Sequence, residues 1–262
     1  MDSYTVYFAK RDLGRERHLR AIPVLDVLDG VVVHAIKGRR KEYKPLKSVI
    51  CESANPVDVA MALKTLGFSW LYFADLNAIT GNGDNFSALV TIVEKTGLQL
   101  MVDAGVSSME KAELILQHHT SKIIIGTETL TNTGFIEKAI SSFGAERVVV
   151  SLDTQNRQIL GRFNLEKFQT PISLLLEFQR MGLTQVVLLD LARVGSKQGV
   201  DDAFVSEVLD NVSFSVLVGG GVRYMNDLLR LDKIGVYGVL LATALYSGTI
   251  AVNDLLAAGF TI

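Results

Sequence analysis

Aspartate residues recur at the ends of short apolar runs, and two of them are well placed for proton transfer. Asp26 follows AIPVL and Asp153 follows RVVVSL. Two carboxyl groups that flank a small substrate can act as general acid and general base when their surroundings move their pKa values apart. Three further acidic residues end other apolar runs, namely Asp75, Asp103 and Asp190. A single aspartate at the end of a strand commonly caps the next helix or turn. Five aspartates at the ends of five apolar runs together predict a ligand site.

Small residues follow other apolar runs and are placed to bind an anion. The segments Asp103-Ala104-Gly105 and Gly219-Gly220-Gly221 each lie between an apolar run and a helix-like segment. Glycine lets backbone N–H groups approach an anion closely, and a helix N-terminus adds partial positive charge. The next apolar run after each of these segments ends in Gly126-Thr127 and in Ala242-Thr243. On this basis we predict these phosphate-binding residues: Ala104, Gly105, Gly126, Thr127, Gly220, Gly221, Ala242 and Thr243. Two such sites imply a bisphosphate-like or elongated ligand.

The elements that must position these residues alternate between strands and helices. Strands are predicted at 21–27, 70–75, 98–103, 122–126, 147–152, 184–190, 214–218 and 238–241. Helices are predicted at 55–66, 86–96, 108–119, 131–142, 167–182, 202–212, 224–234 and 250–258. The strands are continuously apolar, which is typical of parallel strands buried on both faces. Strict alternation favours an α/β fold, a single (β/α)₈ TIM barrel, whose active site lies at the C-terminal strand ends.

An internal repeat divides the chain into two similar halves. LQLMVDAGVSSM at 98–109 aligns with FSVLVGGGVRYM at 214–225, and LYFADLNAI at 71–79 aligns with VVLLDLARV at 186–194. IPVLDV at 22–27 aligns with VVSLDT at 149–154, which makes Asp26 and Asp153 equivalent positions on opposite sides of the barrel. We therefore predict an N-terminal extension at 1–20 and a barrel at 21–262, built from duplicated half-barrels at about 21–142 and 143–262.

Composition excludes several classes of function. The formal charge of −2 provides no general attraction to nucleic acid or to an anionic membrane. No apolar run approaches the roughly 20 residues that a spanning helix requires, and the first 20 residues lack the apolar core of a signal peptide. Cys51 is the single cysteine, so it forms no intramolecular disulfide and joins no cysteine cluster for a metal. These features predict a cytoplasmic protein that binds a small molecule.

The residues quoted above resemble a known family. IPVLDVLDGVVV, the aspartate of VVVSLDT, VGGGVRYMNDL and the doubled phosphate loops are similar to the histidine-biosynthesis barrel enzymes. These are phosphoribosylformimino-aminoimidazole carboxamide ribotide isomerase and the cyclase subunit of imidazole glycerol phosphate synthase. The resemblance covers roughly 21–258 and implies half-barrel duplication, two phosphate sites, and no metal or organic cofactor. It also implies that Asp26 is the base that removes the C2 proton in an Amadori rearrangement and that Asp153 is the acid that opens the ribose ring.

The chain departs from the family pattern at several of these positions. The family reads Asp-Gly-Thr after the sixth strand, where this chain has Val194 in place of the aspartate and Ser196 in place of the threonine. Ser196 keeps a hydroxyl group and is the third predicted catalytic residue. Asp103 and Ala242 replace glycines of the two phosphate loops. A basic loop at 37–47 is a candidate cover over the site or a solvated surface loop, and the whole resembles a divergent archaeal subgroup.

Three functions follow as alternatives. The first is an isomerase of a phosphorylated sugar or phosphoribosyl intermediate by aldose–ketose rearrangement. The second is a cyclase or lyase that uses the same aspartates and has a glutaminase partner. The third is a barrel that binds a phosphorylated metabolite without chemistry, as the missing strand-6 aspartate would allow.

Overall fold

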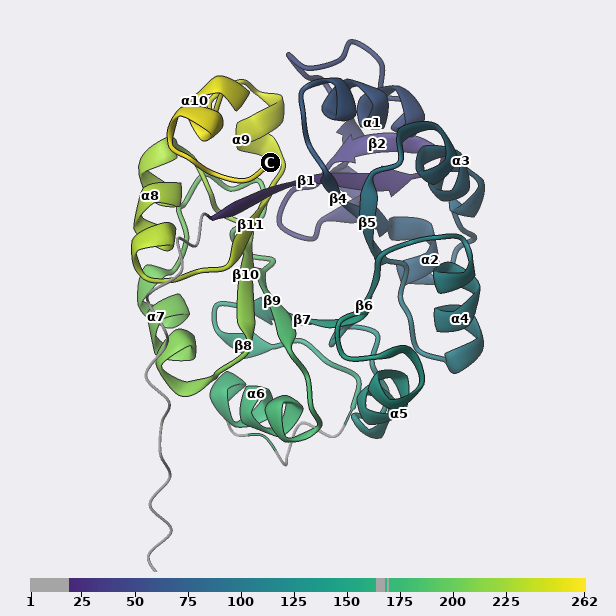
Figure 1. Cartoon of the computed structure of the whole chain (residues 1–262), viewed down its shortest axis with the longest axis vertical. Helices are drawn as coiled ribbons and strands as arrows, with labels where there is room; N and C mark the ends of the chain where they lie inside the picture. The colour runs from purple at the N-terminus through teal and green to yellow at the C-terminus, as the bar shows by residue number, and fades with distance from the viewer. Residues whose placement is uncertain (1–18, 164–167, 169) are drawn as a thin grey trace, which may run out of the picture.

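Eight parallel strands form a closed ring in the computed structural model, which describes residues 19–163, 168 and 170–262 (Figure 1). The ring strands are β1 (Arg20–Leu28), β4 (Trp70–Asp75), β5 (Gln99–Asp103), β6 (Lys122–Gly126), β7 (Val148–Gln155), β9 (Gln185–Asp190), β10 (Ser215–Gly219) and β11 (Gly238–Leu241). They pair in chain order, and the parallel pairing of β1 with β11 closes the ring. The predicted (β/α)₈ barrel is therefore confirmed, because each predicted strand coincides with a ring strand.

Helices surround the ring on its outer side (Figure 1). They are α1 (Pro56–Thr65), α3 (Phe86–Thr96), α4 (Met109–Gln117), α5 (Gly134–Phe143), α6 (Pro171–Arg180), α7 (Asp202–Asn211), α8 (Met225–Lys233) and α10 (Val252–Ala257). The start signals act as predicted: the Asn55 side chain accepts from the N–H groups of Val57 and Asp58, and Ser108 accepts from that of Lys111. The helix predicted from residue 167 begins instead at Pro171, where Thr170 and Ser173 form a capping box.

Short elements outside the eight predicted strands and eight predicted helices lie at the C-terminal ends of the ring strands. They are β2 (Val31–His34), the 3₁₀ turn η1 (Arg40–Glu42), β3 (Lys44–Pro45), α2 (Leu76–Thr80), β8 (Gln158–Ile159) and α9 (Thr243–Tyr246). β2 pairs antiparallel with β1, and β8 pairs antiparallel with β7. The first strand of each predicted half thus carries a hairpin partner. The half-barrel duplication itself stays a prediction, and residues 1–18 of the predicted extension lie outside the described residues.

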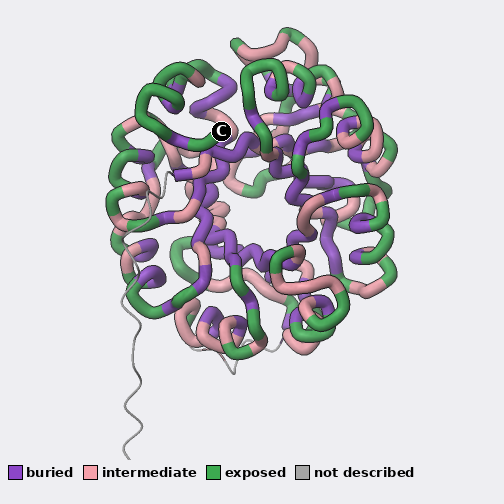
Figure 2. The backbone as a smooth tube through the Cα atoms, viewed as in Figure 1, coloured by how far each residue is buried: buried purple, intermediate pink, exposed green. Residues whose placement is uncertain are grey.

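Apolar side chains fill both sides of the barrel wall. Buried residues follow the ring strands, whereas exposed residues lie on the outer faces of the helices (Figure 2). A cluster inside the ring includes Ile22, Met101, Ile124, Val149, Val187 and Leu217. This two-sided burial explains the continuous apolar runs. No helix among the described residues is both long enough and apolar enough to cross a membrane.

Aromatic and basic side chains lie at the N-terminal end of the barrel. The Arg20 guanidinium lies 5.5 Å from the ring centre of Trp70 and 5.2 Å from that of Tyr237. The Lys122 ammonium lies 5.6 Å from the Trp70 ring and donates to Gln185 Oε1 at 2.7 Å. These contacts, below the apolar cluster, cover the end of the ring opposite the predicted site.

Candidate active site

A cavity of about 220 Å³ opens at the C-terminal ends of the ring strands. Among the predicted site residues, Asp26, Asp103, Gly126, Asp153, Gly220, Gly221, Ala242 and Thr243 line this cavity. They come from β1, β5, β6 and β7 and from the loops after β10 and β11. The ring therefore gathers residues that are more than 200 positions apart in the sequence, at the end where this fold builds its active sites.

Asp153 is a buried carboxyl group held by hydrogen bonds on both oxygens. Ser151 Oγ donates to its Oδ1 at 2.7 Å, and the Glu128 N–H donates to its Oδ2 at 3.0 Å. Thr127 contributes in two ways, since its hydroxyl is 3.5 Å from Oδ2 and accepts the Asp153 N–H at 2.9 Å. Burial raises the pKa of Asp153 to about 7, with a further increase from the charge of Asp103.

Asp26 lines the same cavity but its carboxyl group has no hydrogen-bond partner among the described residues. Burial raises its pKa to about 7; the charge of Asp103 adds to this shift, and Arg40 opposes it. An unpartnered carboxyl group with a pKa near neutrality is suited to accept a proton from a bound substrate. The Asp26 carboxyl group is therefore less restrained than that of Asp153, although the sequence repeat predicts equivalent positions for the two residues.

Asp103 adds a third carboxyl group to the cavity. The Tyr72 hydroxyl donates to its Oδ2 at 3.1 Å, and the Gly105 N–H donates to its Oδ1 at 3.3 Å. Burial raises the pKa of Asp103 to about 6, while these two hydrogen bonds lower it. Burial, with a further increase from the charge of the same carboxylate, raises the pKa of Tyr72 well above its usual value, so Tyr72 stays a hydrogen-bond donor at neutral pH.

The loop after β10 provides an open anion site. The backbone N–H groups of Gly220, Gly221 and Val222 have no acceptor among the described residues, and all three residues line the cavity. Gly220 and Gly221 have φ of +86° and +92°, a conformation that glycine adopts without strain. Such consecutive N–H groups are a common phosphate site after the seventh strand of this fold.

Basic side chains lie around the Gly220–Val222 loop. Lys197, Arg193 and Arg223 line the same part of the cavity wall. Arg193 is paired with Asp190 and Arg223 with Asp227, whereas Lys197 has no acidic partner among the described residues. His34 bonds Thr243 at 2.9 Å through Nε2 and Oγ1, and burial together with Lys197 lowers the pKa of this imidazole. Lys197 therefore lies near the end of the cavity formed by the loops after β10 and β11.

The loop after β6 is closed to an anion. The N–H groups of Thr127, Glu128 and Thr129 already donate to Ser151 O, Asp153 Oδ2 and Gly126 O. A methyl carbon at Gly126 would lie 3.1 Å from Asp153 Oδ2, so a carboxylate takes the space beside this glycine. Gly105 faces the backbone of Ala78 and Ile79 rather than the cavity. Ala104 and Gly105, predicted to bind phosphate, are thus outside the cavity wall.

Four other predicted residues have structural roles in this arrangement. Ser196 does not line the cavity, because its hydroxyl donates to Arg193 O at 2.8 Å within a turn. Asp75 caps α2 through Ala78 N–H and accepts from Asn85, and Asp190 accepts from Ala192 N–H and Arg193. Thr127 is fully buried and acts on Asp153. The alternative of helix and turn capping therefore holds for Asp75 and Asp190. Asp103 also caps a turn through Gly105 N–H, whereas Asp26 and Asp153 cap neither a helix nor a turn.

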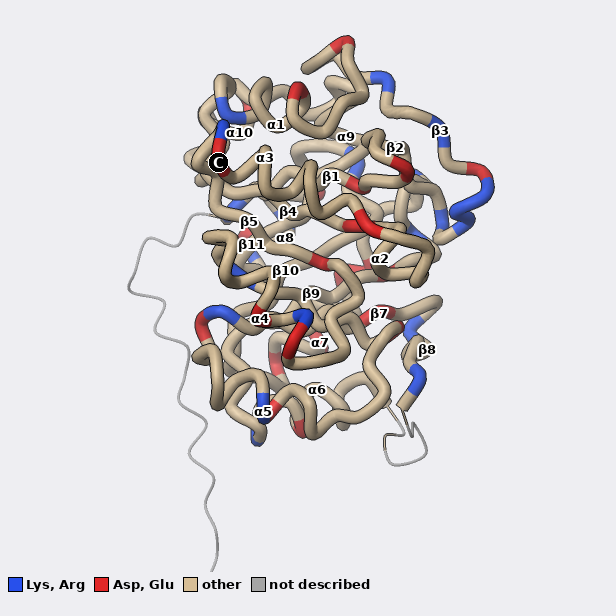
Figure 3. The backbone as a smooth tube through the Cα atoms, turned by 90° about the vertical axis from the view of Figure 1, so that its right-hand side faces the viewer, with Lys and Arg blue, Asp and Glu red and all other residues tan. Residues whose placement is uncertain are grey.

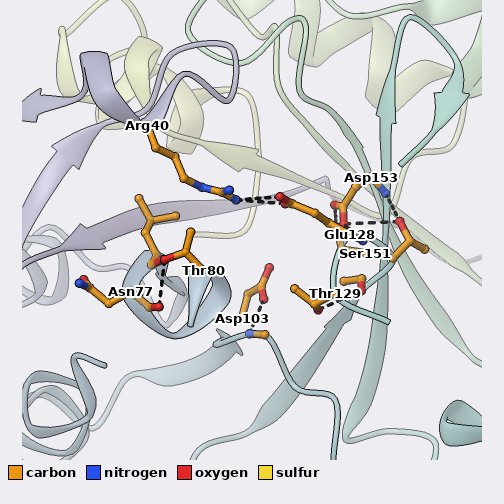
Figure 4. A network of polar contacts seen from close by, with 12 residues as sticks. Arg40, Asn77, Thr80, Asp103, Glu128, Thr129, Ser151 and Asp153 are labelled. Atoms are coloured by element: carbon orange, nitrogen blue, oxygen red, sulfur yellow. Dashed lines mark hydrogen bonds and ion pairs between the residues drawn. The ribbon is translucent and has the colours of Figure 1, made fainter. Parts of the chain in front are cut away.

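The basic loop crosses the mouth of the cavity. Lys37 N–H donates to Val194 O at 2.9 Å, and Arg40 Nη2 lies 3.1 Å from both carboxylate oxygens of Glu128. Figure 3 shows basic residues along the backbone of the segment before β3, and Figure 4 shows Arg40 reaching toward Glu128, with Asp153 and Asp103 close by. The loop thus links the wall after β6 to the loop after β9 and covers the carboxyl groups.

Sequence reasoning missed Tyr72, Glu128 and Lys197 as cavity residues. Tyr72 lies in a continuously apolar strand, where the pattern does not show which residues face the interior. Glu128 directly follows the predicted pair Gly126-Thr127, and its acidic character is the signal that could have identified a closed phosphate loop. Lys197 has a positive φ of +58°, a backbone state that the sequence does not indicate.

The comparison with protein families matches residues 20–251 to a model described as histidine biosynthesis protein. The chain belongs to this family. It is 37% identical over 240 residues to an uncharacterized protein of Methanocaldococcus jannaschii, covering 91% of this chain and 98% of the relative. It is also 31% identical over 236 residues to a protein of Methanosphaera stadtmanae, covering 90% of this chain and 97% of the relative. A protein of Methanosarcina barkeri is 32% identical over 232 residues, covering 87% of this chain and 92% of the relative.

The Methanosphaera and Methanosarcina relatives are both named 1-(5-phosphoribosyl)-5-((5-phosphoribosylamino)methylideneamino)imidazole-4-carboxamide isomerase. The family expected from the sequence is therefore confirmed, and these two relatives are named as isomerases of a phosphoribosyl compound.

Proposed function

We propose that this protein is an isomerase that converts a phosphorylated aminoaldose into the corresponding aminoketose by acid–base catalysis. The observation that carries the proposal is the pair of carboxyl groups, Asp26 and Asp153, whose pKa values are both raised to about 7 in one cavity beside an open anion loop. A general acid and a general base work best when their pKa values lie near the operating pH. The names of the isomerase relatives support the same reaction class.

The proposed mechanism assigns one proton transfer to each aspartate. Protonated Asp153 donates its proton to the ring oxygen, the C1–O bond opens, and the nitrogen lone pair forms a C=N bond to C1. Asp26 as carboxylate then removes the C2 proton, which leaves an enolamine. Protonated Asp26 then returns its proton to C1, and the C2 hydroxyl proton passes to the Asp153 carboxylate. These transfers give the ketone and restore both residues, so the reaction has no net change in atoms or electrons.

The surroundings of the two residues support this assignment. Asp153 is fixed by Ser151 and the Glu128 N–H, which suits a donor that must meet one ring atom. Asp26 has no such restraint and can follow the carbon that loses its proton. Val194 lines the cavity where the family has an aspartate, so no carboxylate from that loop competes for the proton.

Substitution of either aspartate tests the proposal. The wild-type protein is first assayed with a panel of phosphorylated aminoaldoses to find one that it converts. With that substrate, Asp26→Asn and Asp153→Asn should each lower kcat by a factor of about 10²–10⁴. Binding of phosphate by the Gly220–Val222 loop should persist, because neither carboxyl group contacts that loop. A ¹H NMR measurement in D₂O should show loss of the C2 proton signal in the wild type and its retention in Asp26→Asn. Full turnover by either variant would contradict the mechanism.

Two other outcomes would favour the alternative functions. Copurification of a stable glutaminase, with turnover only in the presence of ammonia, would instead indicate the cyclase or lyase alternative. Tight binding of a panel member without conversion would indicate the binding protein without chemistry.

A further inference from the structure

Two cations share one aromatic ring at the N-terminal end of the barrel. The Arg20 guanidinium and the Lys122 ammonium lie 5.5 Å and 5.6 Å from the centre of the Trp70 ring. These residues begin β1, β6 and β4, so closure of the ring of strands brings them together. None of the three lines the cavity that holds the catalytic carboxyl groups. The cluster is therefore separate from the candidate active site.

Lys122 has a neutral acceptor but no acidic partner. Its ammonium donates to Gln185 Oε1 at 2.7 Å. In the described part of the chain, neither Lys122 nor Arg20 forms an ion pair with a carboxylate. Burial and the charge of Arg20 lower the pKa of Lys122, and Glu146 opposes this shift. A larger share of Lys122 is therefore unprotonated near neutral pH than of a lysine on the surface.

The surroundings of this half-buried amine indicate which electrophile suits it. An unprotonated lysine is a nucleophile. An acyl group would turn Lys122 into a neutral amide, which offers Arg20 no negative charge. Carbon dioxide instead turns the amine into a carbamate anion, whose two oxygens match the paired N–H groups of a guanidinium. The charge beside Arg20 then changes from positive to negative, so a repulsion becomes an attraction.

We propose that Lys122 is a site of carbamate formation with dissolved carbon dioxide and that the carbamate pairs with Arg20. The lone pair of the neutral amine forms an N–C bond to the carbon of CO₂, and one C=O electron pair moves onto oxygen. A proton passes from the nitrogen to water, so the balance is R–NH₂ + CO₂ → R–NH–COO⁻ + H⁺. The remaining N–H donates to Gln185 Oε1. This modification goes beyond the proposed isomerase reaction and does not depend on it.

Chemical trapping tests the proposal on the full chain. The protein is incubated with ¹³C-bicarbonate near neutral pH, carbamates are ethylated with triethyloxonium, and tryptic peptides are identified by mass spectrometry. The comparison residues are Lys64, Lys95 and Lys138, which are exposed on α1, α3 and α5. Occupancy at Lys122 should be about tenfold higher than at these lysines, because one unit of pKa changes the amine fraction tenfold. Occupancy at Lys122 no higher than at the three exposed lysines would overturn the proposal.

A matched pair of variants tests the part assigned to Arg20. Arg20→Met removes the neighbouring charge and keeps an apolar chain against the Trp70 ring, so occupancy at Lys122 should fall about fivefold. Arg39→Met removes an exposed arginine from the basic loop at the opposite end of the barrel and should leave it unchanged. An unchanged occupancy in Arg20→Met, or an equal fall in Arg39→Met, would contradict the role of Arg20.

Thermal unfolding provides a second measurement. The carbamate forms preferentially in the folded chain, where Arg20 is its partner, so bicarbonate should raise Tm relative to chloride at equal ionic strength. Lys122→Arg keeps the positive charge but cannot react, because arginine stays protonated, and this variant should lose the rise. No rise in the wild type, or an equal rise in Lys122→Arg, would contradict the pairing.

Discussion

Replacement of Asp103 by asparagine should move the pH dependence of the reaction to lower pH. A methyl carbon at Gly126 would lie 3.1 Å from Asp153 Oδ2 and 4.0 Å from Asp103 Oδ2, so these oxygens are at most about 7 Å apart. At this distance and an effective dielectric constant of about 20, the two charges interact by about 2 kcal/mol. Solvent at the cavity mouth reduces this value, so we expect the pKa of Asp153 to fall by about one unit in Asp103→Asn.

The sign of the effect is the same for both catalytic groups. A negative neighbour favours the protonated form of a carboxyl group, and its removal therefore lowers the pKa values of Asp26 and Asp153 from about 7. Asp26 must be ionised and Asp153 protonated, so both limbs of the kcat/KM profile shift toward lower pH. The shift can be measured without substrate by carboxyl ¹³C NMR titration of aspartate-labelled protein. Unmoved titrations of both groups, or a shift to higher pH, would refute this reasoning. Glu113→Gln, which removes the same charge from the exposed face of α4, is the control.

Three further changes have defined outcomes. Asp227→Asn should lower the free energy of unfolding by about 3 kcal/mol at pH 7, because two arginines lose a buried partner. The pKa of Asp227 is held below its usual value, so the difference in stability between wild type and variant should shrink as pH falls below about 4. Urea titrations measure this difference. Arg40→Met removes the contact with Glu128 and should raise KM about tenfold while Tm changes little, as differential scanning calorimetry can show. Gly220→Ala places a methyl carbon 2.8 Å from Asp190 O at a residue with a φ of +86°, so it should lower the free energy of unfolding by about 1–3 kcal/mol. It should also lower the affinity for pentyl phosphate, measured by calorimetry. Unchanged affinity would place the phosphate elsewhere.

Most of the fold could be predicted from the sequence because burial on both faces leaves a strong pattern. The predicted strand 122–126 matches β6 residue for residue, and Asp26, Asp103 and Asp153 do meet in one cavity. The sequence could not distinguish these three aspartates from Asp75, because all four lie at the ends of apolar strands. Only the positions of the N–H groups that follow each strand decide which carboxylate caps a helix. The closed loop after β6 could not be predicted either, since it depends on a hydrogen bond between Glu128 N–H and Asp153.

Among the described residues, the apolar cluster inside the ring and the basic and aromatic side chains beneath it fill the barrel below the cavity. Arg20, Trp70 and Tyr237 cover the lower end, so substrate, product and water share the mouth beneath the basic loop. The Arg40–Glu128 ion pair, about one-third exposed, lies at this mouth. Dissolved salt screens such pairs. Ionic strength should therefore speed the release of product and weaken the hold on phosphate, so that kcat and KM rise together along a salt titration.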